Sequence, residues 1–176
     1  MKCKKCDIAY EIVKGMVSVY NDWNNFNELQ SEAWHCEMKL NFLKDLLNVV
    51  QGYYISTVTI KQETRMMVKE WQHLSSFNNL KNYNEECKKL INNALSNPSL
   101  SNSNNDIELR SQLRSFKNNP SKRNFRHLYR LAWETIAIME KKKKEYDERL
   151  KIVVEQKQLW EKLHNQIKRW YEGEKE

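Results

Sequence analysis

Glycine and proline are scarce in this chain, with 3 Gly and 2 Pro among 176 residues. All-β and α/β folds need many turns and use more of both residues. The shortage therefore favours a small number of long helices without breakers. The sequence predicts an all-α protein.

Long apolar runs are also missing. No uncharged apolar stretch approaches the roughly 18 residues that a membrane-spanning helix requires. Asp7 and Glu11 interrupt the N-terminal segment where a signal peptide would have its apolar core. We therefore expect a cytoplasmic or nuclear protein with no membrane span, whose 4 Cys are reduced thiols.

Motifs of the common enzyme classes are absent as well. The sequence contains no glycine-rich phosphate loop and no nucleophile elbow, and its carboxylates are too scattered to suggest a catalytic pair. We expect a non-enzymatic protein that uses no cofactor and no small-molecule substrate.

Apolar residues at helical spacing divide the chain into predicted helices. Their expected ranges are 7–20, 28–50, 57–80, 84–95, 106–117 and 121–172. The expected breaks are the Asn-rich stretch Asn21–Asn27, a helix stop at Gly52 followed by the β-prone segment 53–60, the polar stretch 96–105 and the run Asn118–Ser121. Asp106 is the expected N-cap of the fifth helix. These ranges predict an N-terminal helical bundle over 1–95, a polar linker over 96–105, and a C-terminal part over 106–176 that packs with the bundle as one domain.

The last predicted helix dominates the sequence. Its apolar residues follow a spacing of three and four that resembles a coiled-coil seam, although Lys142, Arg149 and Gln156 interrupt it. A helix of about 50 residues reaches about 75 Å, which is longer than a compact domain of this size. We expect an elongated helical bundle whose last helix either kinks near the lysine run 141–144 or projects.

A projecting helix needs a partner for its apolar side. Tryptophan and tyrosine are enriched at protein interfaces. We therefore predict a scaffold or adaptor subunit that binds a partner protein, helical or acidic, or a second copy of itself. The predicted contact residues are Val153, Trp160, Ile167, Trp170 and Tyr171. Trp133, earlier on the same helix, is expected to pack in the core.

Positive charge is concentrated toward the C-terminus. The net charge is +7, and residues 118–176 alone carry a net charge of +5. The segment 117–130 has no acidic residue, and the aromatic residues Phe116, Phe125 and Tyr129 are interleaved with its cations. The cations are Lys117, Lys122, Arg123, Arg126 and Arg130, joined by His127. The alternative function is therefore nucleic-acid binding, with phosphate contacts and base stacking. A solvated helix start explains the same charges, as does an acidic protein partner.

Metal binding by a helical bundle is the third hypothesis. Cys3 and Cys6 form one Cys-x-x-Cys pair without two obvious further ligands. Three Glu-x-x-His patterns, ending at His35, His73 and His164, match a spacing used in di-iron bundles. The helical wheel turns Glu161, the acid of the last pattern, toward solvent, so this hypothesis is the weakest.

Overall fold

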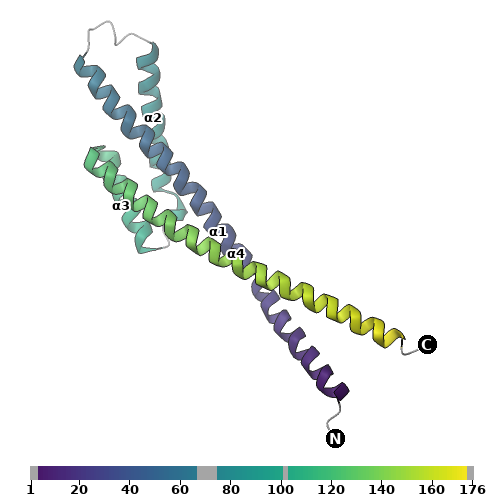
Figure 1. The fold of residues 1–176 in the computed structure, drawn as a ribbon. Helices are drawn as coiled ribbons and strands as arrows, with labels where there is room; N and C mark the ends of the chain where they lie inside the picture. Colours follow the sequence, from purple (N-terminus) through teal and green to yellow (C-terminus); the bar gives the residue numbers. More distant parts are fainter. Residues whose placement is uncertain (1–3, 67–74, 101–102, 174–176) are drawn as a thin grey trace. The chain divides into compact units, whose positions relative to one another are not determined.

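The computed structural model describes residues 4–66, 75–100 and 103–173, and over these ranges it contains helices and no strand (Figure 1). The elements are α1 (Lys4–Met66), α2 (Ser75–Leu95), the short 3-10 helix η2 (Pro98–Leu100), α3 (Asn104–Asn118) and α4 (Lys122–Gly173). The prediction of an all-α fold with a long C-terminal helix is confirmed. α4 runs through the lysine run 141–144 as a single helix of 52 residues.

α1 corrects three predicted breaks, because it is one helix of 63 residues. Neither Asn21–Asn27 nor Gly52 ends it, and the β-prone segment 53–60 is helical. Within 21–27, the half-buried rings of Trp23 and Phe26 are stacked with their centres 4.5 Å apart. Beyond this stretch, buried residues repeat at alternating steps of four and three, and their packing stabilises the helix. These residues are Leu29, Ala33, Cys36, Leu40, Leu43, Leu47 and Val50.

Local contacts explain why the segment after Val50 stays helical. A Cβ atom at Gly52 would collide with the hydroxyl group of Tyr83 on α2, so this glycine permits close helix packing and does not cap a helix. Serine and threonine hydroxyl groups often compete with the backbone hydrogen bonds of a helix, but here they donate to carbonyl groups of the same helix. Ser56 donates to the Tyr53 carbonyl (3.1 Å) and Thr59 to the Ile55 carbonyl (2.8 Å). The predicted helix 57–80 thus divides between α1 and α2, and its residues 67–74 lie outside the described ranges.

The chain divides into two compact units. Residues 38–140 form the central unit, and residues 1–37 with 141–176 form the terminal unit. α1 and α4 each contribute to both units.

The central unit has a core to which every helix of the unit contributes. Its fully buried side chains include Leu43, Ile91, Leu100, Leu109, Leu113, Phe116, Leu128 and Ile136. Leu100 belongs to the predicted polar linker, and it is buried because η2 turns it into this core. Burying a leucine or phenylalanine side chain contributes about 1.5–3 kcal/mol, so this core is the main stabilising element of the unit.

The start of α3 differs from the sequence prediction. Ser103 is its N-cap, because the serine hydroxyl accepts a hydrogen bond from the backbone N–H of Asp106 (3.2 Å). Asp106 therefore lies inside the first turn, where its carboxylate is buried and forms an ion pair with the Lys39 ammonium group (2.7 Å). Negative charge in a first turn is also favoured by the helix dipole.

In the terminal unit, the two helix segments run antiparallel. The Trp160 indole of α4 lies against Gly15 of α1, where it occupies the space that a Cβ atom would need. Further along α1, the Lys157 ammonium group lies 3.6 Å from the centre of the Trp23 ring. From the first contact to the second, the residue number rises on α1 and falls on α4, which shows that the two helix segments are antiparallel.

Candidate anion-binding groove

A groove on the central unit is lined by the first turns of α4 together with α3 and the connection between them. Its volume is about 920 Å³. The lining residues are Lys122, Arg123, Asn124, Arg126, His127 and Arg130 of α4, Asn119 and Ser121 of the connection, and Gln112 of α3. We refer to this surface as the cationic groove.

Short-range hydrogen bonds hold the α3–α4 connection in place. The Ser121 hydroxyl accepts a hydrogen bond from the backbone N–H of Asn124 (3.2 Å), as a serine does at the start of a helix. The Asn124 side-chain amide in turn donates to the Asn119 carbonyl (2.8 Å). Three residues separate the two helices, so the end of α3 is held next to the first turns of α4. The predicted break at Asn118–Ser121 is confirmed, and it positions the groove.

The cations of α4 point away from the core because of their spacing. Leu128 is buried, and at 100° per residue it lies about 200° around the helix from Arg126. Lys122, Arg126 and Arg130 recur every four residues and therefore form a row on the outer side of α4.

The positive charge in the groove is largely uncompensated. Within the described residues, Lys122, Arg123 and Arg126 form no ion pair. Arg130 makes one long contact, with 3.6 Å between its Nε atom and the Glu134 carboxylate, and both side chains are exposed. Exposed pairs of this kind are worth at most about 1 kcal/mol.

In the later part of α4, several lysines have an acidic residue four positions further along the helix. Lys143 lies 2.9 Å from the Asp147 carboxylate, and this hydrogen bond raises the pKa of Lys143 above its usual value. The same spacing of four residues pairs Lys144 with Glu148 and Lys151 with Glu155. Within the lysine run, Lys143 and Lys144 thus each have an acidic partner one turn further along α4.

Four of the five predicted nucleic-acid-binding residues lie together in the groove. They are Lys122, Arg123, Arg126 and Arg130. Lys117 is not among the lining residues; its side chain is half-buried, and its carbonyl accepts a long hydrogen bond (3.4 Å) from the Tyr53 hydroxyl. Burial raises the pKa of that tyrosine, with a smaller contribution from Glu85.

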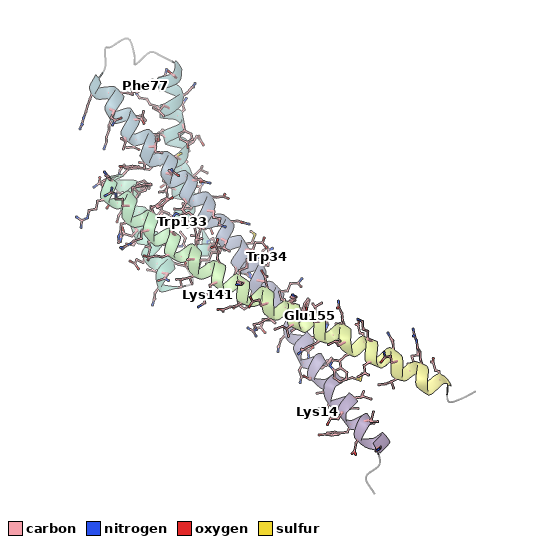
Figure 2. All side chains as sticks on the ribbon, viewed as in Figure 1. Lys14, Trp34, Phe77, Trp133, Lys141 and Glu155 are labelled. Carbon is pink, nitrogen blue, oxygen red and sulfur yellow. The ribbon has the colours of Figure 1, made fainter. Side chains whose placement is uncertain are left out.

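The aromatic side chains near the groove are arranged differently from the prediction. Phe116 is completely buried, so it is not available to stack on a ligand. Phe125 is stacked on Tyr54, with ring centres 4.4 Å apart, and Tyr129 and Trp133 continue this row along α4. Trp133, which Figure 2 labels on α4, was expected in the core. It is 46% exposed. On the helical wheel it lies only about 20° from Lys122, one turn beyond the cations.

Several groove residues were not predicted as site residues. Asn119 and Ser121 were predicted only as part of the break Asn118–Ser121, and Asn124 only as part of the helix 121–172. Gln112 carries no sequence signal, because its place in the groove depends on how α3 packs against α4.

The predicted partner-binding residues belong to the terminal unit. Val153, Trp160 and Ile167 are half-buried there. Trp170 and Tyr171 are part of α4, but their side chains lie outside the described set. The apolar side chains of this half of α4 that remain exposed are Ile152, Leu159 and Leu163.

The metal hypothesis has no support in the described part of the chain. There, no group of three or more His, Cys, Asp or Glu side chains is placed to hold a metal ion. Cys3, the side chain of Cys6, and the Glu70–His73 pattern lie outside that part. The His35 ring is bonded through Nδ1 to the Ser31 carbonyl of its own helix (2.7 Å).

None of the described helices combines the length and apolar character that crossing a bilayer requires. Comparison of the chain with models of known protein families, with curated proteins and with solved structures finds no match.

Proposed function

We propose that this protein is a non-enzymatic helical protein that binds nucleic acid through the cationic groove. One observation carries the proposal: four cationic side chains meet in a concave surface in which three of them have no acidic partner among the described residues. Phosphate groups are the anions that such arginine-rich surfaces bind best. The positive end of the α4 dipole adds to the attraction.

The spacing of the cations favours a polymer over a single phosphate. Neighbours in the row Lys122, Arg126 and Arg130 are separated by about 6 Å along the helix axis, so the row extends over about 12 Å. A row of this length can contact successive phosphates of one strand, whereas a small anion would use only part of it.

The first prediction concerns salt. Four phosphate contacts on a single strand correspond to a slope of about −3 for the logarithm of the binding constant against the logarithm of salt concentration. We therefore expect the affinity for a single-stranded oligonucleotide to fall roughly 50-fold between 50 and 200 mM salt. Fluorescence anisotropy with labelled RNA and DNA measures this slope. A flat salt dependence, or no binding at low salt, would contradict the proposal.

The second prediction concerns Trp133. An exposed indole beside a row of cations is suited to stacking on a base, and such stacking contributes about 1–3 kcal/mol per base. We expect Trp133→Ala to lower the affinity for single strands at least about 5-fold, which corresponds to the lower end of that range, without changing the salt slope. Affinity for duplexes, whose bases are already stacked, should stay the same.

Two variants serve as controls for Trp133. Trp133→Phe retains an aromatic face and should keep most of the affinity. Trp34→Ala removes another exposed tryptophan, on α1 in the terminal unit, and should have no effect. An equal loss for single strands and duplexes would show that Trp133 does not stack on bases.

Assembly with another protein is the second candidate function, and the terminal unit supports it. A surface that leaves large apolar side chains such as Ile152 and Leu159 exposed is typical of protein interfaces. In this proposal, Trp160 packs α4 against Gly15 of α1, and Val153, Ile167, Trp170 and Tyr171 remain predicted contact residues. Affinity purification with and without nuclease separates the two candidates, because a directly bound protein partner survives nuclease treatment and an RNA-bridged one does not.

A further inference from the structure

The N-terminal part of α1 leaves an unusual amount of apolar surface exposed. Six large apolar side chains between residues 8 and 20 are exposed by 46% or more. They are Ile8, Tyr10, Val13, Met16, Val17 and Tyr20. Isolated exposed apolar residues are normal, but a contiguous group on one helix marks a surface that binds something.

Four members of this group, Tyr10, Val13, Val17 and Tyr20, form a second stripe, separate from the face of α1 that packs on α4. Ile8 lies on the α4-facing side, about 20° from Gly15 around the helix. Gly15 faces Trp160, whereas Val17 lies about 160° away around the helix. Tyr10, Val13, Val17 and Tyr20 follow the three-and-four spacing of a helix-packing seam. One face of α1 therefore packs on α4, and another apolar face of the same helix remains exposed.

Two hollows lie on the terminal unit where α1 meets α4, and Trp160 lines both. The first has a volume of about 690 Å³, and its lining combines apolar residues such as Ile8, Ile12 and Ile167 with charged and polar residues such as Asp7 and Glu11. The second, of about 550 Å³, is lined by residues that include Met16, Tyr20 and Trp23. A pair of helices cannot cover its own outer faces, so further helices are needed to fill these hollows.

The net charges of the two segments of the terminal unit indicate which helices could pack against them. Residues 4–37 carry 3 basic and 6 acidic side chains, a net charge of −3. Residues 141–173 carry 10 basic and 6 acidic side chains, a net charge of +4. The terminal unit thus consists of one acidic and one basic segment. A second copy of the protein carries segments of both charges. Its basic α4 segment can lie against the acidic α1 segment of the first copy, and its acidic α1 segment can lie against the basic α4 segment of the first copy.

We propose that two copies of this protein pair through their terminal units and form a four-helix bundle, with α1 of each protomer beside α4 of its partner. Two-fold pairing is self-complementary, so a single kind of contact covers the exposed stripe on both copies. In such a bundle every helix has neighbours of opposite charge, whereas α1 against α1 would bring acidic segments together. This proposal is independent of the cationic groove, which lies in the central unit.

The mass of the full-length protein in solution tests the proposal. Sedimentation equilibrium should give a dimer across the micromolar range. The double variant Val13→Glu with Val17→Glu should be monomeric at the same concentrations, and its far-ultraviolet circular dichroism should not change, because both side chains are exposed in the single chain. A wild-type protein that is monomeric throughout this range would overturn the proposal.

A matched control separates this surface from exposed apolar residues in general. Leu90 and Ile107 are comparably exposed on α2 and α3 of the central unit. The variant Leu90→Glu with Ile107→Glu should remain dimeric. If it dissociates as the α1 variant does, or if the α1 variant stays dimeric, the contact is not the one proposed.

Ionic strength tests the pairing of α1 with α4. Attraction between oppositely charged segments is screened by salt, so the dimer dissociation constant should rise from low to high ionic strength. A constant or falling value would contradict this arrangement. Because none of these measurements contains nucleic acid, their outcome is separate from that of the nucleic-acid proposal.

Discussion

Replacing Arg126 and Arg130 by glutamate should lower the affinity for single-stranded RNA and DNA by at least about 15-fold at physiological salt. That value counts only the two lost phosphate contacts, and the added glutamates will increase the loss by repelling the strand. The slope of the salt dependence should become shallower by about 1.4, because each phosphate contact on a single strand accounts for about 0.7. Anisotropy titrations at several salt concentrations measure both quantities.

A charge-matched variant on the same helix serves as the control. Lys144→Glu with Lys151→Glu reverses two charges in the terminal unit, where both lysines already have acidic partners. Its affinity should stay close to that of the wild type. If both variants bind equally well, the groove does not bind nucleic acid; if both lose affinity equally, only the net charge of the protein matters.

Replacing Phe116 by alanine should reduce the free energy of unfolding by about 3–5 kcal/mol, the usual loss when a buried phenylalanine is truncated. Phe116 is completely buried and contacts the edge of Tyr53, with ring centres 5.6 Å apart, and also lies 6.2 Å from the ring of Phe125. Its removal leaves a cavity where α1, α3 and α4 meet. Urea unfolding followed by circular dichroism should show a lower midpoint.

The comparison for this variant is Ile107→Ala, on the same helix. Ile107 is 61% exposed, so its truncation should change the stability by no more than about 0.5 kcal/mol. Similar losses for both variants would mean that Phe116 does not carry the packing described above. Phe116 also supports the end of α3, next to the cationic groove. We therefore expect the variant to bind nucleic acid less tightly under conditions in which the protein is partly unfolded.

Part of the site could be read from the sequence because it depends on local spacing alone. Lys122, Arg126 and Arg130 share one side of any helix that contains them, and the run Asn118–Ser121 breaks any helix that precedes it. Lys117 lies on α3, before the break at Pro120, and does not line the groove. Phe116 was expected to be available for stacking but is buried, and Trp133 was expected in the core but is exposed. Helical spacing shows which residues share a face of a helix, but not how deeply each is covered.

The continuity of α1 shows a second limit of sequence reasoning. Asparagine, glycine and β-branched residues each disfavour a helix by less than about 1 kcal/mol, so their local signals are weak. Contacts with segments far along the chain cover these stretches: the Lys157 ammonium group of α4 lies over the ring of Trp23, within the asparagine-rich stretch. The close approach of Tyr83 to Gly52 is likewise a long-range contact.

By itself, the sequence determined that the protein is helical, that its last helix is long, and that one stretch near the start of this helix is rich in cations. These properties follow from composition and from periodicity along the chain. Only the tertiary structure decided that α3 completes a groove with four of those cations, that Trp133 lies exposed beside them, and that the face of α1 around Val17 is left exposed. Such properties depend on which distant segments cover each side chain, and helical periodicity does not contain that information.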